Sequence, residues 1–166
     1  MSDLFATANL ITGAPMASSG QLGVVDTVQQ FPLGMRVSGT DAVGGYAEYV
    51  YLKGVASTIV GSVVTYDETG ATALITATSV GPVAVATAIT VASTFGWYGV
   101  TGTFPTDVVA NCADNAKLGR ETTNGKVGDS YAAGYQIMGA VSRAATTAAA
   151  VVNCQFNNPW VGMDVA

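Results

Sequence analysis

The chain has no histidine among its 166 residues, and only 10% of its residues are charged. Without histidine, the Ser–His and Cys–His pairs of nucleophilic catalysis cannot form, and the usual general base near neutral pH is absent. Zinc sites that use imidazole are excluded for the same reason. A carboxylate pair of the glycosidase type stays open, because its two members need not be close in sequence. We predict no enzyme and no catalytic, cofactor-binding or metal-binding residues.

Charged side chains are few for a soluble domain, which normally carries about 25%. The mean hydropathy is +0.40, and 38 consecutive residues from Thr69 to Thr106 include no charge. Threonines, serines and the Gly81-Pro82 pair interrupt this stretch, so it lacks the 18 or more apolar residues of a membrane-spanning helix. Threonine, valine, isoleucine and alanine in near alternation predict β-strands packed on a core or on another chain. The composition indicates a protein that works inside an assembly.

The six basic residues are scattered and never adjacent, although the net charge is −5. A phosphate backbone is bound by clustered lysine and arginine, so nucleic acid is not an expected partner. No basic amphipathic helix is visible, so a membrane surface is not expected either. The first residues, MSDLFATANLITGAP, lack the basic start of a secretory signal.

Three short features have a plain interpretation beside a functional one. Cys112 and Cys154 could form a disulfide, but without a C-x-x-C motif we interpret them as small apolar core residues in a reducing compartment. The segment 119–127 resembles a phosphate-binding loop, yet its glycine spacing and final valine are wrong for one, which predicts a turn. Asp107 and Asp114 could bind a cation, but without an EF-hand pattern they are interpreted as solvated loop acids.

Short β-strand signals separated by turn residues recur along the chain, which is typical of a sandwich or barrel. The predicted fold is therefore all-β, a compact β-barrel or β-sandwich with an extended N-terminal arm. Two hairpins are expected, the second around the connection Asp67-Glu68-Thr69-Gly70. A polar bend is expected over 112–121 and a turn over 122–125. The predicted strands cover residues 35–40, 46–53, 58–66, 71–78, 83–92, 95–100, 107–111, 135–141 and 149–156.

Residues 1–34 are rich in glycine, proline and serine and show no lasting period, which predicts an arm, whereas residues 35–166 form the β domain. The arm is too apolar for a disordered tail, so we expect it to lie on a neighbouring subunit. The candidate interface residues of the arm are Leu4, Phe5, Leu10, Ile11, Val24, Val25 and Phe31. Trp160, near the other end of the chain, is the eighth candidate.

Aromatic residues allow a second interpretation. Tyr46, Tyr49, Tyr51 and Trp97 could line the cavity of a small-ligand-binding β-barrel. Packing in the core or across strands is the commoner use of such residues. The ligand-binding barrel is kept as an alternative function.

Several segments taken in order resemble the capsid decoration, or cement, proteins of tailed bacteriophages. The similarity spans residues 34–162, and its firmer parts are the Gly-Trp-x-x-Val segment and the Pro-x-Val-Gly end. The matching segments are Gly34, Arg36, Val37, Gly39, Thr40 and Asp41, then residues 48–51, 95–102, 110–118 and 152–162.

This resemblance implies an all-β structural protein without catalytic residues or a cofactor. It implies binding to the exterior of the virion capsid between major capsid protein subunits, with homotrimers at local threefold positions and assembly in the host cytoplasm. A tail or fibre module is a further alternative, and a carbohydrate-active enzyme ranks last.

Overall fold

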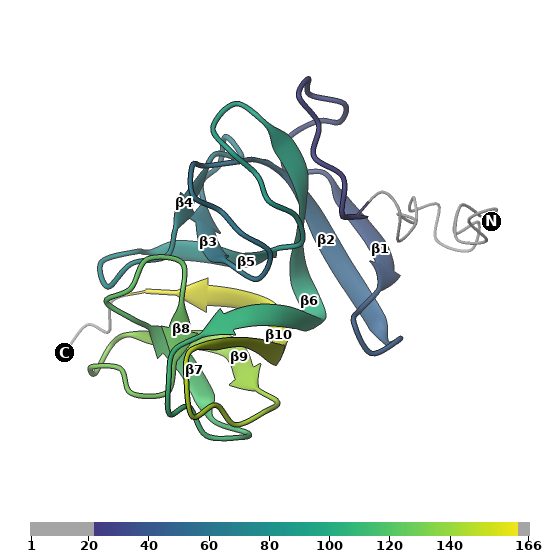
Figure 1. Ribbon diagram of the computed structural model, residues 1–166. Helices are drawn as coiled ribbons and strands as arrows, with labels where there is room; N and C mark the ends of the chain where they lie inside the picture. The colour runs from purple at the N-terminus through teal and green to yellow at the C-terminus, as the bar shows by residue number, and fades with distance from the viewer. Residues whose placement is uncertain (1–21, 163–166) are drawn as a thin grey trace.

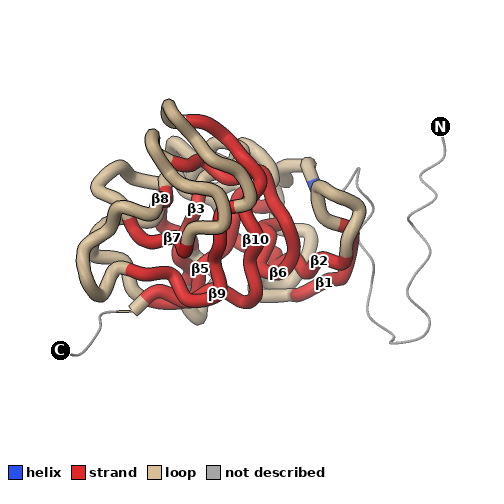
Figure 2. The backbone as a smooth tube through the Cα atoms, turned by 90° about the horizontal axis from the view of Figure 1, so that it is seen from below, coloured by secondary structure: helices blue, strands red, loops and turns tan. Residues whose placement is uncertain are grey.

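The computed structural model describes residues 22–162, and all ten named elements are β-strands joined by loops (Figures 1 and 2). The predicted all-β fold is confirmed. The strands are β1 (Arg36–Thr40), β2 (Tyr46–Lys53), β3 (Val63–Tyr66), β4 (Thr72–Leu74), β5 (Gly81–Ala86), β6 (Phe95–Val108), β7 (Lys117–Arg120), β8 (Val127–Gly128), β9 (Gln136–Ser142) and β10 (Ala150–Val161).

The strands form one sheet that curls back on itself around β6. The order is β1-β2-β6-β8-β7-β9-β10-β5-β3-β4, and β6 also pairs with β10 and β5. The pairings of β6, β8, β7, β9 and β10 close one ring. A second ring, of β2, β6, β5, β3 and β4, is completed by a bridge between Lys53 and Ala71. In Figure 1, β6 runs between β1–β2 and the group β7–β10.

Strand β6 belongs to both rings because its two halves have different partners. Its first half pairs with β2 and its second half, from Thr101 onward, pairs with β10 over eight residues. Gly102 lies between the halves with φ of +123°, a conformation that side chains with a Cβ rarely adopt. One 14-residue strand can thus serve two parts of the sheet.

Strands β2, β3 and β5 of the second ring are largely buried on both faces. Along β2, Val50 and Leu52 point into a small core, whereas Tyr49 and Tyr51 point into the main core. Strand β5 divides its side chains in the same way, with alanines in the small core and valines in the main core. Because both faces of such a strand are buried, its side chains are uncharged. Packing within the chain therefore accounts for much of the uncharged stretch 69–106.

Residues 22–34 pack against the β domain of their own chain. Asp26 and Phe95 exchange two backbone hydrogen bonds of 2.8 Å, and the Asp26 carboxylate accepts a 2.6 Å bond from the Tyr51 hydroxyl. The Phe31 ring lies 5.3 Å from the Tyr51 ring and 5.4 Å from the Trp97 ring. These residues complete the main core. The placement of an arm on a neighbouring subunit stays a prediction, and its first 21 residues lie outside the described part.

Most predicted strands match the structure, with informative exceptions. Both hairpins are present, and β2 has the predicted bounds. The predicted strand 95–100 and the first two residues of the predicted strand 107–111 belong to one strand, β6, which continues through Pro105 and ends at Val108; residues 109–111 are not in a strand. The polar bend predicted over 112–121 contains β7, and β8 was not predicted at all. Both are short, and their pairing depends on partners distant in sequence.

Candidate binding surface around Trp160

Trp160 lies near the end of β10, and 52% of the residue is exposed. Its direct neighbours across the sheet are Met138 on β9 and Pro82 on β5. Thr65 pairs with Val83, so the next residue, Tyr66, lies beside Pro82 on β3. Residues directly opposite each other in a sheet share a face. Met138, Trp160, Pro82 and Tyr66 thus form a row across four neighbouring strands, which we call the Trp160 row.

A hollow lies on each side of this row. The smaller, of about 250 Å³, is lined by Tyr66, Pro82 and Trp160 together with Arg36 and Asn158. The larger, of about 520 Å³, shares Tyr66, Pro82 and Trp160 and is completed by Val80, Gly81, Asp67 and Glu68. Met138 and Val80, 61% and 56% exposed, extend the apolar surface beyond the rings. A tryptophan, a methionine and a valine of this exposure on adjoining strands and loops form an apolar patch of the kind that marks interaction sites.

The two hollows are lined by charged side chains of opposite sign, and Arg36 of the smaller one also pairs with Glu48 at 3.7 Å. In the smaller one, Arg36 Nη1 donates a 2.6 Å hydrogen bond to Asn158 Oδ1, and Arg36 Nη2 donates one of 3.4 Å to the Tyr66 hydroxyl. In the larger one, the Asp67 carboxylate accepts hydrogen bonds from the Thr69 hydroxyl and from the Thr69 and Ala71 amides. The bond from the Thr69 hydroxyl, followed by the Ala71 amide, lowers the Asp67 pKa, so this carboxylate stays ionised.

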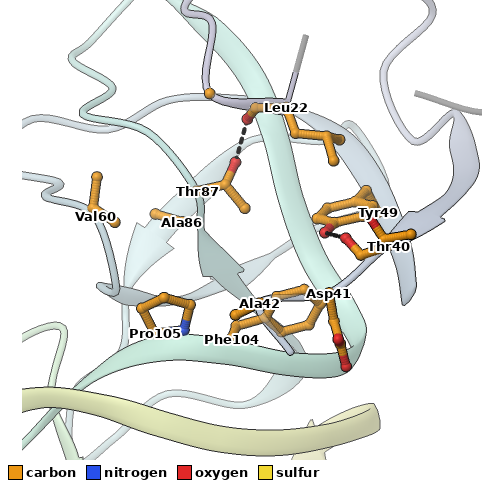
Figure 3. A pocket seen from close by; sticks show the side chains of 11 residues that line it. Leu22, Thr40, Asp41, Ala42, Tyr49, Val60, Ala86, Thr87, Phe104 and Pro105 are labelled. Carbon is orange, nitrogen blue, oxygen red and sulfur yellow. Dashed lines mark hydrogen bonds between the residues drawn. The ribbon is translucent and has the colours of Figure 1, made fainter. Parts of the chain in front are cut away.

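A separate apolar pocket of about 300 Å³ is lined by Phe104 (Figure 3). The Phe104 and Tyr49 rings are 5.5 Å apart, and the Tyr49 hydroxyl donates a 2.6 Å hydrogen bond to the Thr40 carbonyl. Burial raises the Tyr49 pKa to about 12, with a smaller contribution from the Asp41 charge. The pocket is lined by Leu22, Gly23, Thr40, Asp41, Ala42, Tyr49, Val60, Ala86, Thr87, Phe104 and Pro105.

Among residues 22–162, Asp41 is the only acid that lines this Phe104 pocket, and backbone amides already occupy its carboxylate. It accepts hydrogen bonds from the Gly45 amide at 2.7 Å, the Thr103 amide at 2.9 Å and the Val43 amide at 3.0 Å. Burial raises its pKa, but these bonds outweigh burial and leave the pKa lowered. Asp41 therefore fixes the turn between β1 and β2 and is poorly placed to act as a general base.

The alternative ligand cavity predicted from four aromatic residues is not assembled. Tyr49, Tyr51 and Trp97 belong to the main core, and Tyr46 is 62% exposed. Only Tyr49 reaches the Phe104 pocket, whereas Trp97 lines another hollow with Phe31 and Val24.

The eight candidate interface residues fall into three groups. Leu4, Phe5, Leu10 and Ile11 lie outside the described residues. Val24, Val25 and Phe31 lie in the segment that packs on its own domain; Val24 is exposed, and the other two are half-buried. Trp160 is half exposed and lines both hollows beside its row. Thus Val24 and Phe31 come together at one hollow, and Trp160 lies at two others.

Sequence reasoning missed Tyr66, Val80, Pro82 and Met138 as partners of Trp160. These residues belong to segments far apart along the chain and meet only through the strand register. The available signal was the Gly-Pro pair at 81–82, since proline is unusual inside a strand.

The short features of the sequence have mostly structural roles. Cys112 and Cys154 are free and buried, which confirms their interpretation as core residues, and burial raises the Cys154 pKa to about 11. The segment 119–127 forms the β7–β8 turn. The interpretation of Asp107 as a solvated loop acid is wrong, because it is buried at the end of β6 and its Oδ1 lies 2.6 Å from Lys126 Nζ.

Arg120 is the largest fully buried side chain in the described part. Its guanidinium donates hydrogen bonds to the carbonyls of Ser79 and Gly134 and lies 4.3 Å from the centroid of the Tyr135 ring. It thereby joins the β4–β5 loop, which carries Val80, to the β8–β9 loop. Arg120 holds one wall of the larger hollow in place without lining it.

Within residues 22–162, no cluster of three or more Cys, Asp or Glu side chains could hold a metal ion. That same part of the chain includes no helix long and apolar enough to cross a membrane. No protein-family model matches the chain, and searches of curated proteins and of solved structures found no match.

Proposed function

We propose that this chain is a non-catalytic structural protein of a tailed-phage head, which binds the outside of the capsid between major capsid protein subunits and stabilises the shell. The observation that carries the proposal is the exposed Trp160 row with its two hollows. An apolar surface of this kind on a charge-poor protein is well suited to a dry contact with another protein. The sequence resemblance adds the identity of the expected partner.

A bridging protein stabilises a shell because its contacts must break before neighbouring capsomers separate. Tryptophan buried at the centre of an interface commonly carries a large share of the binding free energy. Trp160 is the natural candidate for this role, with Tyr66 and Met138 beside it. Self-association as a trimer would multiply the contacts of each particle and raise its avidity for a symmetric lattice. The expected location is the capsid exterior, with assembly in the host cytoplasm.

Binding to expanded, undecorated capsid shells tests this proposal. Wild-type protein is expected to cosediment with the shells, and Trp160→Ala is expected to bind at least about tenfold more weakly, because truncating a central aromatic hot-spot residue typically costs about 2 kcal/mol or more. Val43→Ala is the matched control, since Val43 is 64% exposed in the β1–β2 turn, away from the row. Cosedimentation that is absent for wild type, or unchanged by Trp160→Ala, would contradict the proposal.

The predicted role of the N-terminal arm needs its own variant. Deleting residues 1–30 would remove the Asp26–Phe95 pairing and so confuse folding with binding. The double variant Phe5→Ser/Ile11→Ser of the full-length chain keeps Asp26 and Phe95 and so does not remove their pairing. If the arm clamps a neighbouring subunit, this double variant binds shells more weakly while its melting temperature is unchanged.

A second candidate function rests on the Phe104 pocket. Its volume of about 300 Å³ lies at the lower limit of small-molecule sites, and its lining is mostly apolar. A ligand bound in this pocket would raise the melting temperature of the isolated protein. Its affinity would be unaffected by Trp160→Ala. The same variant thus separates the two candidate functions.

A further inference from the structure

The larger hollow beside the Trp160 row combines three features of a peptide groove. Aromatic rings stand at two points of one wall, Trp160 on β10 and Tyr66 on β3, with Pro82 on β5 between them. Val80 lines the hollow as well and lies on the loop before β5. Asp67 and Glu68, which follow Tyr66 directly, place two acids at the Tyr66 end.

We propose that this hollow binds an extended, proline-rich segment of a partner protein in the polyproline II conformation, with a basic residue of the segment beside Asp67 and Glu68. The inference rests on the proposed function for the identity of the partner, the shell protein. The chemistry of the bound segment is argued from the hollow alone.

The spacing of the aromatic residues fits this conformation. Trp160 and Tyr66 are two strand positions apart, and neighbouring strands are separated by about 4.8 Å, which places the two side chains about 9.6 Å apart. A polyproline II helix rises about 3.1 Å per residue, so residues three apart on one face repeat every 9.3 Å or so. Two prolines separated by two residues would therefore meet the two rings in register, with the segment lying across the strands.

The polar groups of the hollow also suit such a segment. A polyproline II helix makes no internal hydrogen bonds, so its carbonyl groups need external donors. The indole N–H of Trp160 is such a donor, whereas the Tyr66 hydroxyl accepts its 3.4 Å hydrogen bond from Arg36 on the side of the smaller hollow. Proline loses little conformational entropy when it is ordered, which favours binding to a shallow surface.

Charge sets the direction of the segment. Hydrogen bonds from Thr69 and Ala71 keep Asp67 ionised, and Glu68 adds a second acid beside it. Arg36 lies in the other hollow, on the far side of the row. A lysine or arginine of the ligand is thus attracted to the Tyr66 end, and its contribution to binding falls as salt is added.

Fluorescence anisotropy with the full-length protein tests this inference. The probes are fluorescein-labelled peptides of eight prolines with one arginine, placed first or last, and the control is a glycine–serine peptide of equal length and charge. We expect saturable binding of at least one proline peptide. Trp160→Ala should weaken it about tenfold or more, as is typical of a central aromatic anchor. Met138→Ala, which alters the row outside the hollow, should change it less than about twofold.

Glu68→Gln tests the role of charge. It should weaken binding of the arginine-containing peptide about threefold at low salt and leave a peptide of prolines alone unaffected, because exposed ion pairs are weak. Circular dichroism and melting curves of all variants show whether each is folded.

Three outcomes would overturn the inference. The first is that the glycine–serine peptide binds as tightly as the proline peptides. The second is that no proline peptide changes the anisotropy at millimolar concentration. The third is that Trp160→Ala changes the oligomeric state of the protein in sedimentation. The last would assign this surface to a second copy of the chain. Shell binding that needs Trp160 without any peptide binding removes this inference and leaves the proposed function. Peptide binding without shell binding removes the proposed capsid function and leaves the proline-peptide site.

Discussion

The uncharged stretch from Thr69 to Thr106 and the Trp160 row are both apolar, but only the first is largely covered by the chain itself. Strands β5 and β6 have side chains in the main core on one face and in the small core on the other. Trp160 and Met138 lie more than half exposed on the outer surface. Low charge alone therefore does not identify an interface. An apolar side chain indicates a partner only where its own fold leaves it uncovered.

The strongest test of this comparison uses two isoleucines of the uncharged stretch. Ile75 is fully buried in the main core, whereas Ile89 is 63% exposed on the β5–β6 loop. Ile75→Ala should lower the free energy of unfolding by about 2–5 kcal/mol, because it removes buried contacts and leaves a cavity. Ile89→Ala should change it by less than about 0.5 kcal/mol. Urea unfolding measures both free energies. Equal effects would contradict the claim that the fold covers Ile75 and leaves Ile89 uncovered.

Gly99 on strand β6 allows a test of how tightly the main core is packed. A Cβ added to Gly99 would come within 2.5–2.7 Å of three atoms of the Phe104 ring, which packs between Tyr49 and Phe156. Gly99→Ala should therefore cost about 1–3 kcal/mol of stability through overpacking. Gly23→Ala is the control, since nothing lies within 4 Å of its added Cβ. A stable Gly99→Ala variant would show that this part of the core can shift.

The fluorescence of the two tryptophans distinguishes a covered from an uncovered apolar side chain, because Trp97 is 5% exposed and Trp160 is 52% exposed. In the isolated protein, Trp160→Phe should leave blue-shifted emission that acrylamide quenches weakly. Trp97→Phe should leave red-shifted emission that acrylamide quenches strongly. Protection of Trp160 without any added partner would mean that copies of the chain already cover it. Trp160→Ala should lower the stability by less than about 1 kcal/mol, because the side chain is only partly buried.

A further expected effect appears only at high pH. The pKa values of Tyr49 and Tyr51 are raised to about 12, chiefly by burial, with a further increase at Tyr51 from its hydrogen bond to Asp26. The unfolded chain ionises these groups near pH 10, so their contribution is intact below pH 10 and is lost as the pH rises toward 12. Tyr49→Phe should show a shallower fall in stability above pH 10. Denaturant unfolding at a series of pH values would measure it, and an unchanged slope would contradict the burial of this hydroxyl.

The sequence predicted the parts of the fold that depend on local pattern. Turn residues located both hairpins, and the aromatic-rich segment 46–53 located β2 with its full bounds. The two cysteines were interpreted as core residues because neither a C-x-x-C motif nor any histidine accompanies them. These features are encoded by neighbouring residues, so no knowledge of the tertiary structure is needed to infer them.

Only the tertiary structure decided which apolar residues are left uncovered. Trp160 was a candidate from its type, but Tyr66, Val80, Pro82 and Met138 join it through the register of four strands. Asp107 was misinterpreted because its partner, Lys126, is 19 residues away and meets it inside the fold. Pairing between distant strands fixes which face each side chain occupies, and a one-residue change of register would reverse it. Composition indicated an apolar protein, and the register decided where its apolar surface is exposed.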